Sequence, residues 1–162
     1  MAADDPLVQK ALDRIAFLNS DILRLKRFVN DAVETVYRLT GGRVGLWRPK
    51  PGKWGTARLT TIGRRSGKEH AVIIGYIEDG PNFVTLAMNG WGEGEPAWWL
   101  NLQAHPEIRA ETVDGPRLFR AHAAEGDERT RLWDRWREVD RQLDAYAARR
   151  SQETAVVVLE PR

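Results

Sequence analysis

The segment from Thr61 to Lys68 brings three cations, two hydroxyl groups and two glycines into one short connection. Glycine lets the backbone turn sharply, so several N–H groups can point towards one place, and such an arrangement attracts anions. Arginine and lysine side chains add donors and positive charge for phosphate or carboxylate oxygens. The residues of this candidate anion site are Arg64, Arg65, Ser66, Gly67 and Lys68. A solvated hairpin tip is the alternative interpretation, since surface turns are often basic.

A second segment, residues 88–102, combines glycines with tryptophans. Three glycines within five residues, at 90, 92 and 94, allow a close approach of the backbone to a ligand. A helix predicted to begin at Pro96 offers unpaired N–H donors, and the rings of Trp91, Trp98 and Trp99 are flat enough to cover a ring system. The alternative is a loop that leads into a helix whose tryptophans belong to the core.

Several kinds of chemistry find no support in the sequence. Cysteine is absent, which excludes disulfides, thiolate metal sites and a cysteine nucleophile. The three histidines, His70, His105 and His122, lie far apart and form no helical pair of the kind that zinc enzymes use, so we predict no metal site. The sequence also contains neither a Walker motif nor a Gly-rich dinucleotide fingerprint.

Length and charge limit the class of protein. The 162 residues suit one domain, and the net charge is only +2 because 25 lysines and arginines face 23 acids. This balance gives little reason to expect a nucleic-acid partner. No apolar run approaches the roughly 20 residues of a membrane span, and the acidic N-terminus does not resemble a signal peptide. We therefore expect a cytoplasmic protein with a small-molecule ligand.

The first 40 residues are predicted to be helical. Apolar residues recur every three or four positions, which indicates amphipathic helices over roughly 5–18 and 21–39, with an interruption at Asn19–Asp21 and an end at Gly41–Gly42. The polar side of the helices carries both charge signs, so peripheral membrane contact is not supported. We expect the segment 1–40 to pack on the rest of the chain or on a partner.

The remaining residues alternate between strand and helix patterns. We predict strands at about 56–62, 69–78, 81–88, 107–113, 117–124 and 154–159, with helices at 96–105 and 127–150, the second capped by Asp127. The last strand is apolar on both faces, which favours a central position in a sheet or barrel. This order predicts an α+β fold around an antiparallel sheet.

Residues 59–68, the run that continues to Tyr76, and residues 96–106 together resemble the deazaflavin-dependent nitroreductase family, with matching order and spacing across residues 36–161. The resemblance implies a split β-barrel, FMN-binding-like and antiparallel, in residues 41–162, with N-terminal and flanking helices. It also implies binding of the deazaflavin coenzyme F-420, a relative of FMN with a phosphate and an oligoglutamate tail.

The resemblance also implies roles for individual residues. Residues 64–68 would hold the phosphate and the acidic tail. His70 stands where family members often have arginine, so its contribution to tail binding is weaker near neutral pH. Trp98 and Asn101 would brace the site. The residues expected along the deazaflavin ring are Ala87, Met88, Asn89 and Gly90.

The implied reaction is hydride transfer from reduced F-420 to an electron-poor small molecule such as an enone, a quinone or a nitro compound. Tyr146 is the candidate general acid, because it is the tyrosine that the last predicted helix offers to the substrate side; solvent is the alternative proton source. Two other functions remain open: a non-catalytic carrier of deazaflavin or of an apolar ligand such as a fatty acid, and an FMN-binding reductase on the same fold. Both a monomer and a homodimer fit the sequence.

Overall fold

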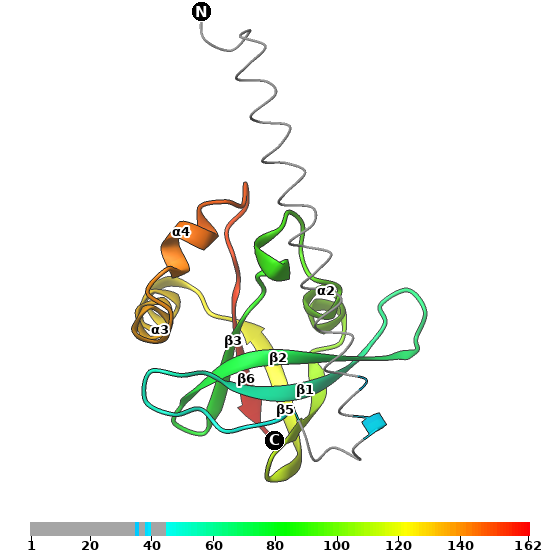
Figure 1. Ribbon diagram of the computed structural model, residues 1–162. Coiled ribbons are helices and arrows are strands. Elements are labelled where there is room, and N and C mark those ends of the chain that lie inside the picture. Colours follow the sequence, from blue (N-terminus) through cyan, green and yellow to red (C-terminus); the bar gives the residue numbers. More distant parts are fainter. Residues whose placement is uncertain (1–34, 36–37, 40–44) are drawn as a thin grey trace, which may run out of the picture.

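The computed structural model of the protein describes Thr35, Arg38, Leu39 and residues 45–162 (Figure 1). Those three N-terminal residues are helical. The rest of the helices predicted over 5–18 and 21–39, and the domain boundary predicted near residue 40, lie outside the described residues.

The described part of the chain forms a closed antiparallel barrel with the strand order β1-β2-β3-β6-β5-β4. The strands are β1 (Gly55–Ile62), β2 (Glu69–Asp79), β3 (Asn82–Leu86), β4 (Glu107–Thr112), β5 (Gly115–Ala123) and β6 (Val156–Pro161). Closure removes the free sheet edges on which other chains could pair. The expected α+β fold with an antiparallel barrel is confirmed.

Strand β6 shows how the apolar pattern builds two cores. Val157 and Leu159 belong to the barrel interior, together with the aromatic residues Tyr76, Phe83 and Phe119. Val156 and Val158, which alternate with them, belong to a second core between the barrel and the helices that follow β5. Because successive residues of a strand face opposite sides, a strand buried on both sides must be apolar throughout. The predicted central position is confirmed, since β6 pairs with both β3 and β5.

Three α-helices and one 3₁₀ turn accompany the described part of the barrel: η1 (Asn89–Trp91), α2 (Ala97–Ala104), α3 (Gly126–Val139) and α4 (Leu143–Ala147). Figure 1 shows α2 on one side of the barrel and α3 with α4 on another. Helix α2 packs on β1 and β5, whereas α3 packs on β6. The β1–β2 turn and the segment after β3 lie at the same end of the barrel as α2, since residues of all three line one pocket.

The prediction of a single helix over residues 127–150 is wrong, because this segment forms two helices, α3 and α4. At Asp140 the backbone leaves helical geometry, with φ −128° and ψ 99°, and the Asp140 carboxylate accepts a hydrogen bond from the backbone N–H of Gln142 at 2.9 Å. This side-chain bond competes with the helical hydrogen bonds. The predicted cap is also wrong: Glu125 occupies the N-cap, and Asp127 lies in the first turn of α3.

Candidate functional site

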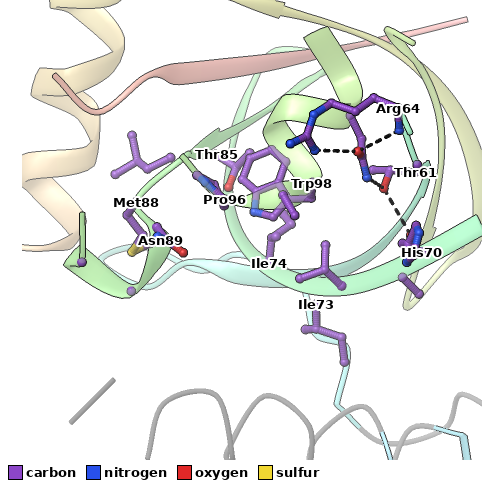
Figure 2. A pocket seen from close by; sticks show the side chains of 18 of the residues that line it. Thr61, Arg64, His70, Ile73, Ile74, Thr85, Met88, Asn89, Pro96 and Trp98 are labelled. Carbon is purple, nitrogen blue, oxygen red and sulfur yellow. Dashed lines mark hydrogen bonds between the residues drawn. The ribbon is translucent and has the colours of Figure 1, made fainter. Parts of the chain in front are cut away.

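A pocket of about 850 Å³ opens between α2 and the first three strands. Its volume falls within the roughly 300–1,000 Å³ of small-molecule sites. Figure 2 shows Trp98 in the middle, with Thr61 and Arg64 on one side and Met88 and Asn89 on the other. The lining consists of residues 61, 63–66, 70–75, 85–86, 88–90, 92–93, 96–98 and 101. Most of the predicted site residues thus lie around one cavity, although they are separated in the sequence.

One end of this pocket is basic. Arg64, Arg65, Ser66 and His70 line it, whereas Gly67 and Lys68 belong to the same turn without lining the cavity. The arginine and lysine side chains of the turn are exposed, and none of them forms an ion pair within the described part of the chain. Unpaired cations on a concave surface favour an anionic ligand.

The backbone of the turn contributes less to anion binding than the sequence suggested. Gly63 N donates to Lys68 O at 2.8 Å and Gly67 N donates to Gly63 O at 2.8 Å, so these N–H groups close the turn. Lys68 N donates to Ser66 Oγ at 3.3 Å. Gly67 has φ +67°, which explains the glycine at this position. The turn therefore offers an anion chiefly its side chains.

Asn101, in α2, holds this turn in place. Its side chain is buried, with the residue 5% exposed; Oδ1 accepts hydrogen bonds from Arg64 N at 3.1 Å and from Arg64 Nη1 at 3.4 Å. Asn101 Nδ2 donates to Thr61 Oγ1 at 3.1 Å, and Thr61 Oγ1 donates to His70 O at 3.3 Å (Figure 2). A single amide thus links α2 to the end of β1, to the turn and to the start of β2.

Gly63 lies under two side chains of the site, which would have to move to make room for a larger residue. A Cβ at this position would lie 2.4 Å from Ser66 Oγ and 2.9 Å from His70 Nε2. Ser66 Oγ and His70 Nε2 are themselves 3.3 Å apart, so the serine and the histidine pack directly over the glycine. His70, a predicted site residue at the start of β2, is therefore also in contact with the turn.

The middle of the pocket is apolar. Strand β2 contributes Val72, Ile73 and Ile74, and β3 contributes Leu86. Sequence reasoning did not assign these residues to the site, although β2 begins directly at the basic turn and its first half must run along the same cavity. Trp98 is half-buried at the pocket and packs against the barrel core.

The two neighbouring tryptophans have different roles. Trp99 is 5% exposed and belongs to the barrel core, with its ring centroid 6.4 Å from that of Trp98. Of the two alternatives that the sequence left open for this helix, the core interpretation therefore holds for Trp99. Trp98 combines a pocket surface with a core contact, which suits a residue that braces a site.

At the other end of the pocket the chain leaves β3 at Leu86, two residues before the predicted end of the strand. Met88, Asn89 and Gly90 line the cavity as expected, but Ala87 is fully buried behind them. Asn89 has φ +46° and its side-chain Nδ2 donates to Glu93 O at 2.8 Å. The strand ends early because Met88 already has helical backbone angles, φ −87° and ψ −12°, which are incompatible with extended backbone.

Tyr146 does not reach this pocket. Its ring stacks on Trp91 with centroids 5.9 Å apart, and its hydroxyl donates to Gln142 Oε1 at 2.5 Å. The residue lies on α4, which packs on the far side of the 87–94 segment and contributes nothing to the lining. The structure therefore does not bring the predicted general acid together with the other site residues.

Glu93 is the acidic residue of the pocket lining. Hydrogen bonds from the hydroxyl and the backbone N–H of Ser151, at 2.7 and 2.9 Å, lower the pKa of Glu93 below that of an ordinary carboxyl group. A carboxylate held in its charged form accepts hydrogen bonds and does not act as a proton donor near neutral pH. Among the described residues no cluster of histidine and acidic side chains could hold a metal ion. Nor does any described helix have the length and apolar character that a membrane span requires.

Comparisons with known proteins show to which family the chain belongs. A family model described as F420H(2)-dependent quinone reductase matches residues 30–161. The F420H(2)-dependent quinone reductase Rv1261c of Mycobacterium tuberculosis is 28% identical over 134 residues, which span 80% of this chain and 87% of the relative. A second protein of that organism, Rv3178, is 31% identical over 119 residues, which span 73% of this chain and 96% of the relative.

A solved structure shows the same fold. The F420-H2 dependent reductase FDR-A superposes with a TM-score of 0.61 at 24% identity, over 72% of this chain and 99% of its own. The split β-barrel and the deazaflavin-dependent family expected from the sequence are thereby confirmed. The chain belongs to the F420H(2)-dependent quinone reductase family, a family of oxidoreductases.

Proposed function

We propose that this chain binds the deazaflavin coenzyme F-420 in the 850 Å³ pocket and reduces an electron-poor small molecule at the ring end. The observation that carries the proposal is the polarity of the cavity: Arg64, Arg65 and Lys68 gather at one end without ion-pair partners in the described chain, and the middle is apolar. The coenzyme has the same polarity, with an anionic tail and a flat ring. Membership of the family supports the choice of F-420.

The residues present fit each part of the coenzyme. The exposed guanidinium groups of Arg64 and Arg65 suit phosphate and carboxylate oxygens, for which they supply paired donors. Ile74 and Trp98 provide apolar surface of the kind that a flat ring needs. When bound, the coenzyme supplies the hydride; the protein orients it and excludes water from it.

The substrate that suits this pocket is a flat, apolar acceptor such as a quinone, an enone or a nitro compound. The cavity walls include Ile73, Leu86 and Met88, whose apolar side chains favour apolar ligands. Because Tyr146 lies outside the lining, solvent is the proton source that we assign to the reduced product. We place the acceptor at the Met88–Gly90 end, away from the cations.

A fluorescence titration of the purified protein with F-420, run in parallel with FMN, tests this function. Replacing Arg64 and Arg65 together with alanine should weaken F-420 binding at least tenfold, or about 1.4 kcal/mol. The matched control replaces Lys50 and Lys53, two exposed lysines outside the pocket, and removes the same charge. Unchanged affinity in the folded double-arginine variant would remove the basic turn from the site.

The same titration separates the alternatives. Saturation by F-420 followed by reoxidation of the reduced coenzyme with a quinone, an enone or a nitroarene supports the reductase. Saturation without turnover of any acceptor identifies a carrier, and preference for FMN identifies a flavin enzyme on the same fold. Binding of neither coenzyme would overturn the proposal.

A further inference from the structure

The pocket wall contains an unusual stretch of backbone. Asn89, Gly90 and Trp91 follow one another with φ values of +46°, +63° and +64°, all in the left-handed region. Residues other than glycine rarely adopt this region, and here two of three do so. Such strain persists only where the surroundings impose it, and it gathers at functional sites.

Arg150 is the residue that holds this left-handed turn. Its side chain is 0% exposed, although the residue lies directly after a short surface helix. Nη1 donates to Ala87 O at 2.9 Å, Nε donates to Gly92 O at 3.1 Å, and Nη2 donates to Gly94 O at 2.8 Å. The three carbonyl groups flank the left-handed turn on both sides, so one guanidinium fixes the distance between its two ends.

The buried charge of Arg150 is balanced by its surroundings. Nη1 also donates to Thr154 Oγ1 at 2.7 Å, and the carboxylate of Glu95 lies 3.9 Å from Nη2. A buried arginine that loses these partners would leave its charge uncompensated, which is strongly unfavourable. The guanidinium and the carbonyl groups around the turn therefore depend on each other.

Neighbouring residues extend this contact between the 146–154 segment and the pocket loop. Ser151 donates to the carboxylate of Glu93 from both its backbone N–H and its hydroxyl, at 2.9 and 2.7 Å. Tyr146 stacks on Trp91, which is the last residue of the left-handed turn. We call these contacts of Arg150, Ser151 and Tyr146 the clamp; the loop that they hold contributes Met88, Asn89 and Gly90 to the pocket lining.

We propose that Arg150 is a positioning residue that shapes the 88–93 wall of the pocket before the coenzyme binds. Arg150 is outside the lining, and it acts through the backbone of Met88, Asn89 and Gly90, which the proposed function places beside the deazaflavin ring. The inference rests on that function. A planar guanidinium suits the role, because three separate nitrogens donate to the three carbonyl groups, whereas a lysine has all its donors on one nitrogen.

Hydrogen exchange of the ligand-free protein tests the clamp without the coenzyme. In Arg150→Met, the amides of Trp91 and Gly92 should exchange at least tenfold faster than in the wild type, because their bonds to Met88 O and Asn89 O lose support. Amides of the barrel strands should be unchanged. Arg149→Met is the matched control, since that adjacent arginine is exposed and its guanidinium lies over the ring of Tyr146, 4.8 Å from the centroid.

Coenzyme binding and turnover give the functional readout. Arg150→Met should weaken F-420 binding and lower the rate of acceptor reduction at saturating coenzyme, each by roughly tenfold, while Arg149→Met leaves both unchanged. Arg150→Lys keeps the charge and should fall between the wild type and the methionine variant. If Arg150→Met does not fold, Arg150→Lys alone carries the test.

The outcomes are distinct. Faster exchange at Trp91 and Gly92 together with weaker binding supports the proposal. Unchanged exchange at these amides in a folded Arg150 variant overturns it. If the wild-type protein binds no F-420, the proposed function fails, whereas the exchange data still decide whether Arg150 holds the turn.

Discussion

Replacing Asn101 with alanine should destabilise the protein and weaken coenzyme binding at the basic end of the pocket. The asparagine amide is buried, and it joins Arg64 N and Thr61 Oγ1, two groups that lie 37 and 40 residues away in the sequence. Its removal leaves the Arg64 amide without this acceptor and the Thr61 hydroxyl without this donor. The bond to the Arg64 guanidinium is longer, at 3.4 Å, and that side chain is exposed, so we give it no weight.

The expected loss of stability follows from these two bonds. A hydrogen bond within a protein contributes about 1 kcal/mol net, so the substitution should lower the free energy of unfolding by about 2 kcal/mol. For a domain of this size, that corresponds to a decrease in Tm of roughly 4–8 °C. The turn also becomes less ordered, and fixing its cations again on binding should cost about 1 kcal/mol, or roughly a fivefold weaker Kd for F-420.

Urea unfolding and the fluorescence titration measure the two effects on the same preparation. Gln103→Ala is the matched control, because its side chain is exposed on the same helix and faces away from the turn network. Asn101→Asp separates geometry from charge: it keeps an acceptor for Arg64 but adds a negative charge beside the cations, so it should bind F-420 more weakly than the alanine variant. A free energy of unfolding within about 0.5 kcal/mol of the wild type in Asn101→Ala would refute the reasoning.

Two further substitutions test other parts of the structure. Asp79 accepts hydrogen bonds at 2.8 Å from Arg131 and Arg135 of α3, and the bond from Arg131 is the main cause of its lowered pKa. Asp79→Asn should therefore lower the free energy of unfolding by about 1 kcal/mol at neutral pH. In urea unfolding at several pH values, the difference between variant and wild type should vanish as the pH falls below the ordinary carboxyl pKa and through the lowered pKa of Asp79. A difference that persists at low pH would contradict the assignment. Tyr146→Phe should leave F-420 binding and the rate of acceptor reduction within about twofold of the wild type, because the hydroxyl contacts Gln142 and lies outside the pocket; a tenfold lower rate would place this tyrosine in the reaction.

Local patterns in the sequence were enough to predict most of the barrel. The strands follow from runs of apolar and β-branched residues between turns, and the central position of β6 follows from its apolar residues on both faces. The basic turn was also visible, because its glycines and cations are adjacent in the sequence. The break between α3 and α4 was not visible in the sequence, since it contains neither glycine nor proline. It depends on a hydrogen bond between Asp140 and Gln142.

The role of Arg150 had no local signal. It follows another arginine, Arg149, in a segment with many charged residues, and nothing in the sequence distinguishes the buried one from the exposed one. The backbone carbonyl groups that bind Arg150 belong to residues 56 to 63 positions earlier in the chain. The direction of Tyr146 has no local signal either, because it depends on stacking against Trp91.

The two ends of the pocket follow one rule. Each is an irregular segment whose backbone groups cannot pair in a strand or helix, and a buried backbone group without a partner is costly. In each case a single buried polar side chain from a distant element supplies partners: Asn101 for the basic turn and Arg150 for residues 87–94. The types of side chain suit the two tasks. The amide of Asn101 can both donate and accept, so it serves the Thr61 hydroxyl oxygen, which needs a donor, and the Arg64 N–H group, which needs an acceptor. The guanidinium of Arg150 only donates, which suits the carbonyl groups around it. The donors and acceptors of an irregular segment at the pocket thus determine which type of buried side chain can pair with it, even where the sequence gives no local sign of the contact.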